Sequence, residues 1–239
     1  MNMEIVKINP LMKVTVLTGA GISAESGIKT FRDGDGLWEN HKVEQVATPE
    51  AFEINPELVW DFYKQRYQAS VNAIPNQGHY ALVKLEKALG SNFKLITQNV
   101  DGLHHRAGSR NILDMHGNVE RCFCTKCRKH FKLSDIDMNV RLPLCSDCHG
   151  LLRPDIVWFG EIPYHLDAIE RLILNSNIFI VIGTSGTVYP AAGFVMTAKY
   201  KGAVTIGINL EKPHNIDYFD HFYVGKAGDL LPELIKQWL

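Results

Sequence analysis

Four cysteines are spaced as two pairs that could hold one metal ion. Cys124 and Cys127 form the first Cys-x-x-Cys pair, and Cys145 and Cys148 form the second, with seventeen residues between the two pairs. Each pair can present two thiolates from a tight turn, and two such turns complete a closed tetrahedral Zn²⁺ site. Four thiolates leave no coordination position for water. The spacing therefore predicts one zinc ion that holds structure and does not activate water.

Two disulfides and a redox-active pair are the competing interpretations of these cysteines. A redox Cys-x-x-Cys pair stands alone at the start of a helix, whereas this chain has two pairs. Nothing else in the sequence indicates an oxidising compartment. We therefore favour the structural zinc, and we assign no role to Cys122, the remaining cysteine.

A glycine-rich segment could bind phosphate groups. It runs from Thr18 to Gly27 and follows a short apolar stretch. Glycines let the backbone approach a pyrophosphate, and the N–H groups at the start of a following helix can bind it. The last glycine falls later than in the usual GxGxxG pattern, so a simple tight turn explains this segment equally well on its own.

Polar or small residues also follow three further apolar runs, at 98–101, 183–185 and 209–211. In an open α/β sheet the carboxyl ends of the strands form the ligand crevice. Four such strand ends on one sheet favour a dinucleotide site over a set of unrelated turns.

The elements that must position these groups alternate along the chain. Apolar runs rich in β-branched residues lie at 14–17, 93–96, 178–182 and 203–208, as expected of parallel strands covered on both faces. Helical patterns lie at 77–89, 164–175 and 190–201. The alternation predicts an α/β fold with a Rossmann-like, doubly wound parallel sheet.

We predict one domain over residues 1–239, with two insertions. Its Rossmann-like core would comprise 11–32, 76–117 and 154–239. Residues 33–75 would form a helical insertion, in which Asn55 caps a helix and proline follows at its first position. Residues 118–153 would form the zinc ribbon. The insertions together would make a small domain and leave a ligand cleft against the core.

Composition narrows the function classes. The chain has 239 residues and a formal net charge of −1, which gives no electrostatic argument for nucleic acid or for an anionic membrane. No stretch approaches ~20 consecutive apolar residues, the length of a membrane-spanning helix. The first twelve residues resemble neither a signal peptide nor a transit peptide. We therefore expect a cytoplasmic protein, and a monomer because no assembly motif is evident.

Taken in order, these motifs resemble the sirtuins, which are NAD-dependent protein-lysine deacylases. The resemblance covers nearly the whole chain. It is carried by Gly19–Ser23, Thr30–Arg32, Thr97–Asp101, His116–Gly117, the four cysteines, Gly183–Ser185 and Asn209–Glu211.

The resemblance implies a mechanism and three catalytic residues. The acyl-lysine carbonyl oxygen would attack C1′ of the nicotinamide ribose, expelling nicotinamide and leaving an alkylimidate. His116 would then be the general base that helps a ribose hydroxyl attack the imidate carbon, and its ordinary pKa of ~6.5 suits that task. Asn99 and Asp101 would line the ribose and nicotinamide pocket. The products would be free lysine, nicotinamide and 2′-O-acyl-ADP-ribose. His104 and His105 resemble surface residues on a short helix.

The resemblance also implies an NAD-binding set. Phe31 would shield the site after nicotinamide departs, Arg32 and Gln98 would hold the ribose and phosphate, and Ala227 would lie against the adenine. Contacts to phosphate would come from 183–185, and contacts near the adenosine from residues 209 and 211. The full set is Gly19, Ala20, Gly21, Ser23, Thr30, Phe31, Arg32, Trp38, Gln98, Asn99, Asp101, Gly183, Thr184, Ser185, Asn209, Glu211 and Ala227.

Tyr63 and Arg66 could select the acyl group. They are three residues apart and so share one face of the predicted helix. A guanidinium fork and a phenol together can receive a carboxylate; a packed tyrosine and a surface ion pair are the ordinary alternative. With Ala51, which would widen the acyl pocket, the pair resembles the desuccinylase-type, or class III, sirtuins. That branch recognises succinyl- or malonyl-lysine.

The substrate peptide would add as a strand beside one further segment. Backbone pairing of this kind tolerates many peptide sequences. The segment that the resemblance assigns to the peptide comprises Val157, Trp158, Phe159, Gly160 and Glu161.

We therefore expect NAD-dependent removal of succinyl or malonyl groups, and also of acetyl groups, from lysines of acylated proteins. A plain deacetylase and a mono-ADP-ribosyltransferase are the enzyme alternatives. A reader of NAD or ADP-ribose would bind NAD without consuming it, and a zinc-ribbon nucleic-acid binder would show steeply salt-dependent affinity. The presence of Asn99, Asp101 and His116 argues against both non-enzyme alternatives.

Overall fold

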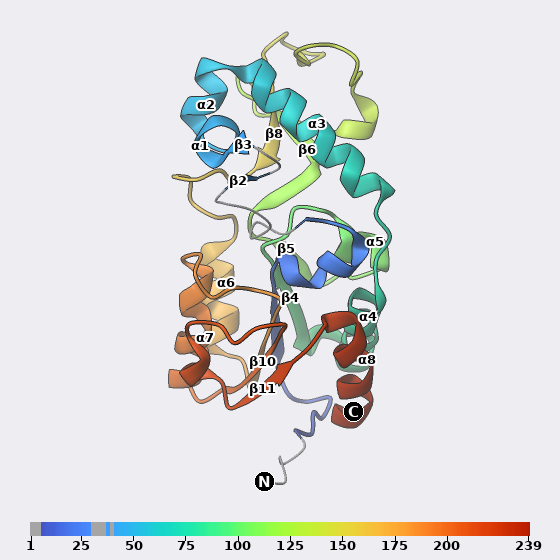
Figure 1. Cartoon of the computed structure of the whole chain (residues 1–239), viewed down its shortest axis with the longest axis vertical. Coiled ribbons are helices and arrows are strands. Elements are labelled where there is room, and N and C mark those ends of the chain that lie inside the picture. The colour runs from blue at the N-terminus through green and yellow to red at the C-terminus, as the bar shows by residue number, and fades with distance from the viewer. Residues whose placement is uncertain (1–5, 30–36, 39–40) are drawn as a thin grey trace.

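A computed structural model describes residues 6–29, 37–38 and 41–239, and Figure 1 draws the remaining residues as a grey trace. The core is a six-stranded sheet in the order β11-β10-β9-β1-β4-β5, in which every pair of neighbours is parallel. The strands are β1 (Val14–Thr18), β4 (Phe93–Thr97), β5 (Ile112–Asp114), β9 (Ile178–Ile182), β10 (Val204–Asn209) and β11 (His221–Val224).

The central strand explains the near-continuous apolar runs in the sequence. Every residue of β1 and of β9 is buried, because helices cover both faces of the sheet. In β1, Val14 pairs with Phe93 of β4 on one side and with Ile178 of β9 on the other. The strand order reverses at this point, which is where open α/β sheets place their ligand crevice.

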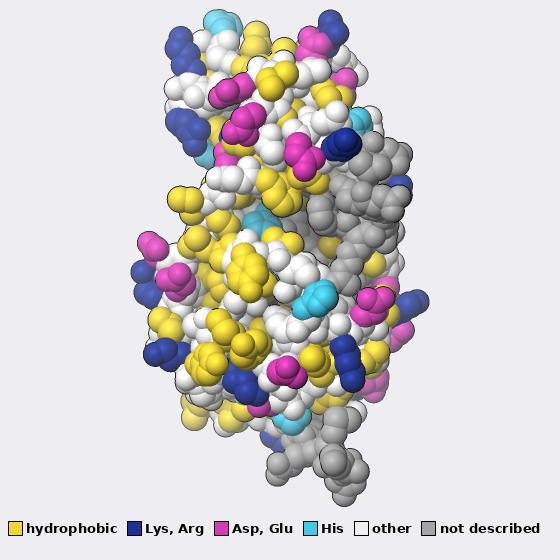
Figure 2. All heavy atoms as spheres, turned by 60° about the vertical axis from the view of Figure 1, so that its left-hand side comes forward, with side chains coloured by type: hydrophobic (Ala, Val, Ile, Leu, Met, Phe, Trp, Pro, Cys, Tyr) yellow, Lys and Arg dark blue, Asp and Glu magenta, His cyan; other side chains and the backbone are white. Residues whose placement is uncertain are grey.

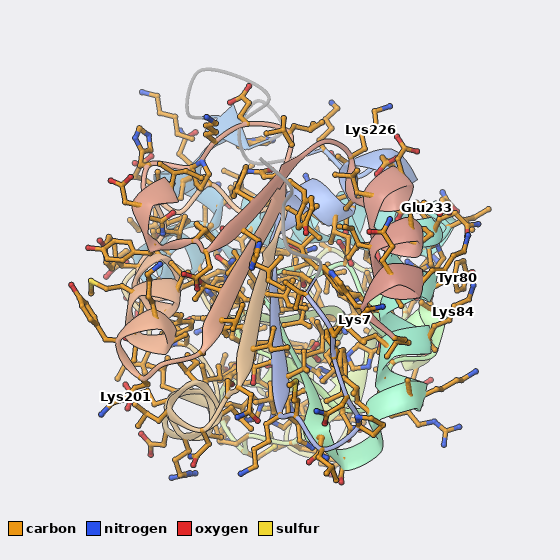
Figure 3. All side chains as sticks on the ribbon, turned by 90° about the horizontal axis from the view of Figure 1, so that it is seen from below. Lys7, Tyr80, Lys84, Lys201, Lys226 and Glu233 are labelled. Carbon is orange, nitrogen blue, oxygen red and sulfur yellow. The ribbon has the colours of Figure 1, made fainter. Side chains whose placement is uncertain are left out.

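Helices form a layer on each face of the sheet, as the view from below shows (Figure 3). α4 (Gln77–Leu89) and α8 (Ala227–Trp238) cover one face. α6 (Leu166–Leu174) and α7 (Ala191–Tyr200) cover the other. The three helices and the parallel, Rossmann-like sheet predicted from the sequence are thereby confirmed, with only the ends of α6 and α7 moved by one or two residues.

A smaller group of elements lies beyond one end of the sheet (Figure 1). Its helices are α1 (Val43–Val46), α2 (Pro49–Ile54) and α3 (Pro56–Asn72), and beside them β2 (Leu37–Trp38) pairs with β3 (His41–Lys42). Its antiparallel sheet has the order β7-β6-β8, formed by β6 (Gly117–Cys124), β7 (His130–Lys132) and β8 (Leu152–Ile156). The short helix α5 (Leu103–Ala107) and the 3₁₀ turns η3 (Gly90–Asn92), η4 (Leu133–Asp135) and η5 (Ile216–Tyr218) connect the elements.

The two predicted insertions pack on each other. Residues of α1 to α3 share one hydrophobic cluster with residues of β6 and β8. The indole N–H of Trp60 in α3 donates to the carbonyl of Leu152 in β8 at 2.9 Å, which satisfies a buried donor across that contact. The domain boundaries drawn from the sequence stay a prediction.

The helix that carries Tyr63 and Arg66 begins where the sequence predicted. The Asn55 side chain accepts a hydrogen bond from the N–H of Leu58 at 3.1 Å, and Pro56 occupies the first position of α3. Among the helices that the structure describes, none is long and apolar enough to cross a membrane.

Candidate functional site

The glycine-rich segment after β1 forms two short 3₁₀ turns, η1 (Ala20–Ile22) and η2 (Ala24–Ser26). The start of a helix, which we expected there, does not form. Side chains from other segments bind carbonyls of these turns: Asn76 Nδ2 donates to the Ile22 carbonyl at 2.7 Å, and Asn99 Nδ2 donates to the Gly19 carbonyl at 3.0 Å. These bonds from outside hold the loop at the carboxyl end of the sheet.

Gly21 and Gly183 bring two strand ends into backbone contact. The Gly21 N–H donates to the Gly183 carbonyl at 2.8 Å, and a Cβ on Gly21 would lie 2.6 Å from the Gly183 Cα. No larger residue fits at either position without moving the backbone. Beside this contact is a pocket of ≈ 200 Å³, which is lined by Gly21, Ala24, Glu25, Gly183, Ile208, Asn209, Leu210, Gly225, Lys226 and Ala227.

Side chains of the strand ends bond to one another around this contact. Gln98 Nε2 donates to the Thr184 hydroxyl at 3.3 Å, and Asn209 Nδ2 donates to the Thr184 carbonyl at 3.1 Å. The ends of β4, β9 and β10 are thereby joined. Ser185 bonds to Thr187 instead, with their hydroxyls 2.6 Å apart, and Glu211 is exposed.

Asn99 and Asp101 meet at Ser23. The Asn99 amide donates to the Ser23 hydroxyl at 3.1 Å, and the Asp101 carboxyl also hydrogen-bonds the Ser23 side chain. The Leu103 N–H donates to Asp101 Oδ1 at 2.9 Å. Burial raises the pKa of Asp101, although these hydrogen bonds partly oppose the shift. The predicted catalytic neighbours therefore do lie side by side.

His116 follows β5 and lies beside the end of β4. Its Nδ1 is 3.1 Å from the Gln98 carbonyl oxygen. A carbonyl only accepts, so Nδ1 carries the proton and the neutral ring has its lone pair on Nε2. Burial lowers the pKa of His116, although the bond to Gln98 opposes this shift. The ring is thus held in the form that can take up a proton at Nε2.

Gly117 fixes the chain immediately after His116. Its φ is +85°, and a Cβ there would collide with the carbonyl of Asp155 in β8. On the same stretch, the Val157 N–H donates to the His116 carbonyl at 3.0 Å. The core therefore holds the His116 ring through Gln98, and the segment after β8 holds its backbone carbonyl through Val157.

Tyr63 is fully buried inside the hydrophobic cluster that α1 to α3 share with β6 and β8. The Trp158 indole N–H donates to its hydroxyl at 2.9 Å, and burial raises its pKa, so the phenol stays neutral. Ala51 is buried in the same cluster. Arg66 is half-buried, with its guanidinium carbon 5.9 Å from the centre of the Phe62 ring.

The segment 157–161 is held to its surroundings by backbone bonds. Besides the bond from Val157 to His116, the Phe159 N–H donates to the Ala47 carbonyl at 3.0 Å. The Glu161 carboxylate accepts from the Trp158 N–H at 2.8 Å and from Arg153, whereas the Phe159 side chain is 50% exposed. Figure 2 shows hydrophobic side chains gathered on this side of the molecule, where the upper part meets the layer of α6 and α7.

Four of the predicted NAD-binding residues cannot be placed as side chains. Thr30, Phe31 and Arg32 lie outside the described residues. Trp38 belongs to β2 by its backbone, but its side chain is also outside the described part.

The four cysteines converge as the sequence predicted. Their sulfurs all lie within 4.8 Å of one another, with Cys124 Sγ 3.5 Å from Cys148 Sγ and Cys127 Sγ 3.7 Å from Cys145 Sγ. A Zn–S bond of about 2.3 Å places tetrahedral sulfurs about 3.8 Å apart, whereas a disulfide needs about 2.05 Å. The four sulfurs therefore fit one zinc ion. Burial raises the pKa of Cys122 to about 12, which keeps it a thiol.

The prediction that His104 lies on the surface is wrong. It is 2% exposed, its Nε2 is 3.0 Å from the Thr18 hydroxyl, and its ring centre is 4.7 Å from that of His79. Helix α5 is so short that its first two residues face the core. His105 does reach the rim, where its Nε2 lies 2.9 Å from Asp114.

Arg106 and Arg153 hydrogen-bond to groups of the candidate site, and the sequence analysis assigned neither of them a role. Arg106 Nη2 donates to the Ser70 carbonyl at 2.6 Å and to the Asp101 carbonyl at 3.3 Å. Arg153 donates to Glu161, the last residue of the predicted peptide segment. None of these partners is related to its arginine by a motif spacing, so no signal in the sequence indicates either arginine.

Comparisons with known proteins agree over almost the whole chain. The sequence profile of the Sir2 family matches residues 19–190. A protein of Bdellovibrio bacteriovorus named NAD-dependent protein deacylase is 52% identical over 229 residues, covering 95% of this chain and 96% of its own. A protein of the same name from Pasteurella multocida is 49% identical over 231 residues, covering 95% and 98%.

Solved structures give the same result. A Sir2 homologue in complex with NAD is 42% identical, with a TM-score of 0.86 over 95% of this chain and 90% of its own. A Sir2 protein in complex with a p53 peptide and NAD⁺ is 32% identical, with a TM-score of 0.81 over 94% and 92%.

The zinc site can be tested by metal content. We expect one zinc per chain, and we expect Cys127→Ser to lose the metal and to lower the melting temperature, because a structural zinc contributes directly to folding. Atomic emission spectroscopy and thermal unfolding measure both. Cys122→Ala is the matched control and should keep its zinc; loss of metal from that variant would contradict the ligand set.

The buried histidines predict a loss of stability in acid. Burial lowers the pKa of His79 to about 4 and holds that of His104 well below its ordinary value. Below pH ~6.5 the unfolded chain binds protons that the folded chain excludes, so stability falls with pH until the folded pKa is reached. The slope is up to about 1.4 kcal/mol per pH unit for each histidine.

Urea unfolding at several pH values between 7 and 4 measures this slope. His79→Gln should flatten it, whereas His214→Gln, a change at an exposed site, should leave it as it is. An unchanged slope in His79→Gln would contradict the assignment.

Proposed function

The chain belongs to the Sir2 family, and from that premise we propose that it is an NAD-dependent protein-lysine deacylase that removes succinyl and malonyl groups and retains activity on acetyl groups. One observation carries the proposal. A half-buried His116, whose Nδ1–H bonds to the Gln98 carbonyl and leaves the lone pair on Nε2, lies beside the strand end that carries Gln98 and Asn99. Gln98 at that strand end bonds to the hydroxyl of Thr184, and the preceding residue, Gly183, lines the glycine-rich pocket.

The residues around the pocket fit a dinucleotide. Gly21 and Gly183 present backbone without side chains, which lets phosphate groups come close. Thr184 and Asn209 offer polar groups at neighbouring strand ends, and Ala227 lies at the pocket wall where α8 begins. NAD would serve as co-substrate: when bound, it supplies a ribose carbon bearing nicotinamide as leaving group, and hydroxyls that can receive the acyl group.

Each catalytic side chain then has one task. His116 would take the proton from a ribose hydroxyl at Nε2, while its Nδ1–H stays bonded to Gln98. Asn99 and Asp101, tied together through Ser23, would fix the wall of the nicotinamide pocket. Ser23, Asn99 and Asp101 are all buried, so this side of the pocket would keep water from the reacting carbon.

The smaller group of elements would receive the acyl-lysine. Val157, at the start of the segment 157–161, donates its N–H to the His116 carbonyl. A peptide paired with this segment would therefore bring its lysine to the catalytic base. Tyr63 contacts Trp158 of that segment, and Arg66 lies one helical turn further along α3. A phenol and a guanidinium at the end of a lysine pocket favour an acyl group that ends in a carboxylate.

Matched acetyl- and succinyl-lysine peptides test the activity directly. In the presence of NAD, we expect both peptides to lose their acyl groups and to yield nicotinamide and acyl-ADP-ribose in equal amounts. Mass spectrometry measures the peptides and both products. His116→Asn should lower turnover at least about 100-fold, because the general base is lost, and should still bind NAD. Binding of NAD by the unmodified protein without turnover of either peptide would instead indicate a reader of NAD.

Arg66→Met tests the acyl preference. It removes charged hydrogen bonds worth about 1.5–3 kcal/mol, so we expect kcat/KM for the succinyl peptide to fall about 10- to 100-fold. Activity on the acetyl peptide should change much less. Lys64→Met removes a neighbouring cation that bonds to the Val140 carbonyl, and it should leave the ratio of the two activities unchanged. Equal losses on both peptides in Arg66→Met would contradict the carboxylate receptor.

A further inference from the structure

Arg153 connects the zinc-bearing sheet to the predicted acyl pocket. It lies in β8 with its side chain 13% exposed. Its two terminal nitrogens grip the Glu161 carboxylate, with Nη1 2.8 Å from Oε1 and Nη2 2.6 Å from Oε2. Nη2 also donates to the Ile156 carbonyl at 3.0 Å. One guanidinium therefore ties down the chain before and after Trp158.

The same guanidinium lies against the Trp158 ring. The Arg153 Cζ is 3.6 Å from the centre of that ring and 5.2 Å from the centre of the Phe123 ring. At such a distance a planar cation stacks on an indole, a contact that lysine, with its compact ammonium, does not reproduce. Arg153 thus restrains the indole itself as well as the backbone around it.

The restrained indole decides how Tyr63 bonds. Trp158 is 2% exposed, packs 5.3 Å from the Phe52 ring, and donates its indole N–H to the Tyr63 hydroxyl at 2.9 Å. An indole nitrogen only donates, so the phenol oxygen accepts from it and must direct its own proton to a different group. With Trp158 fixed, Tyr63 is a hydrogen-bond donor toward its other neighbours, and a donor favours a carboxylate over a methyl group.

We propose that Arg153 is a positioning residue for acyl selection: by stacking on Trp158 it holds the indole that makes Tyr63 a donor to an acidic acyl group. The inference rests on the proposed role of Tyr63 and Arg66 as the carboxylate receptor. Arg153 itself touches neither peptide nor acyl group in this role. It acts through the tryptophan ring.

The ion pair and the stack can be separated by one substitution. Arg153→Lys keeps a cation for Glu161 but loses the flat face against Trp158. Arg128 supplies the matched control, because its Cζ lies 4.4 Å from the centre of the same Phe123 ring, yet it has no described contact with Trp158. Arg128→Lys therefore changes a cation on this aromatic group and leaves the indole as it is.

The experiment compares kcat and KM for succinyl- and acetyl-lysine peptides at saturating NAD. In Arg153→Lys, we expect the ratio of succinyl to acetyl kcat/KM to fall about three- to tenfold, mainly through a higher KM for the succinyl peptide. In Arg128→Lys the ratio should stay unchanged. Equal losses on both peptides in Arg153→Lys would show that the arginine only supports the fold, and the proposal would be overturned.

A second measurement separates this inference from the acyl preference. If the unmodified protein removes acetyl but not succinyl, the proposed preference fails, and a double-mutant cycle of Arg153→Lys with Tyr63→Phe, measured by urea unfolding, then tests only the coupling of Arg153 to Tyr63. Non-additive shifts of the midpoint would support coupling of the two residues through Trp158. Additive shifts would overturn it.

Discussion

The close approach of two backbones, at Gly21 and Gly183, is the constraint on which the site depends. Because no side chain fits between them, the loops after β1 and β9 are held in direct contact. Thr184 follows immediately and bonds to Gln98 and to Asn209 on the neighbouring strands. A larger residue at either glycine would separate these strand ends, and the pocket and the support of His116 would be lost together.

His116 is also the point at which the two parts of the molecule are joined. Its ring bonds to the core through Gln98, and its carbonyl accepts from Val157 in the segment that leads to Trp158. A residue held from both sides cannot follow the movement of either part alone. The predicted base therefore lies where the core meets the segment after β8, and the bond to Gln98 that orients the ring also sets its proton on Nδ1.

Much of this arrangement could be predicted from the sequence, because it depends on local patterns. Continuous apolar runs indicate buried parallel strands, Asn55 and Pro56 mark a helix start, and the cysteine spacing indicates a tetrahedral site. The burial of His104 could not be predicted, since it depends on Thr18 and His79 from other parts of the chain.

The replacement of a helix by two 3₁₀ turns has a similar cause. Asn76 and Asn99, which bind the carbonyls of those turns, are far away in the sequence. Arg153 was missed for a different reason: Trp158 and Glu161 are close to it in the sequence, but a charged residue in a strand gives no sign that it will stack on a particular tryptophan. Chemistry that depends on a local motif could be predicted from the sequence, whereas contacts between segments that are far apart in the sequence could not.

The place of β1 at the centre of the sheet has a consequence for how the chain folds during synthesis. Val14 is synthesised before both of its partners, Phe93 and Ile178, so one side of this strand has no neighbour until Ile178 has been made. Contacts so distant in sequence form slowly, and an unpaired apolar strand edge is prone to aggregate. One edge of β1 is therefore open to wrong pairing until β9 has been made, a hazard that the finished strand, paired on both sides, no longer carries.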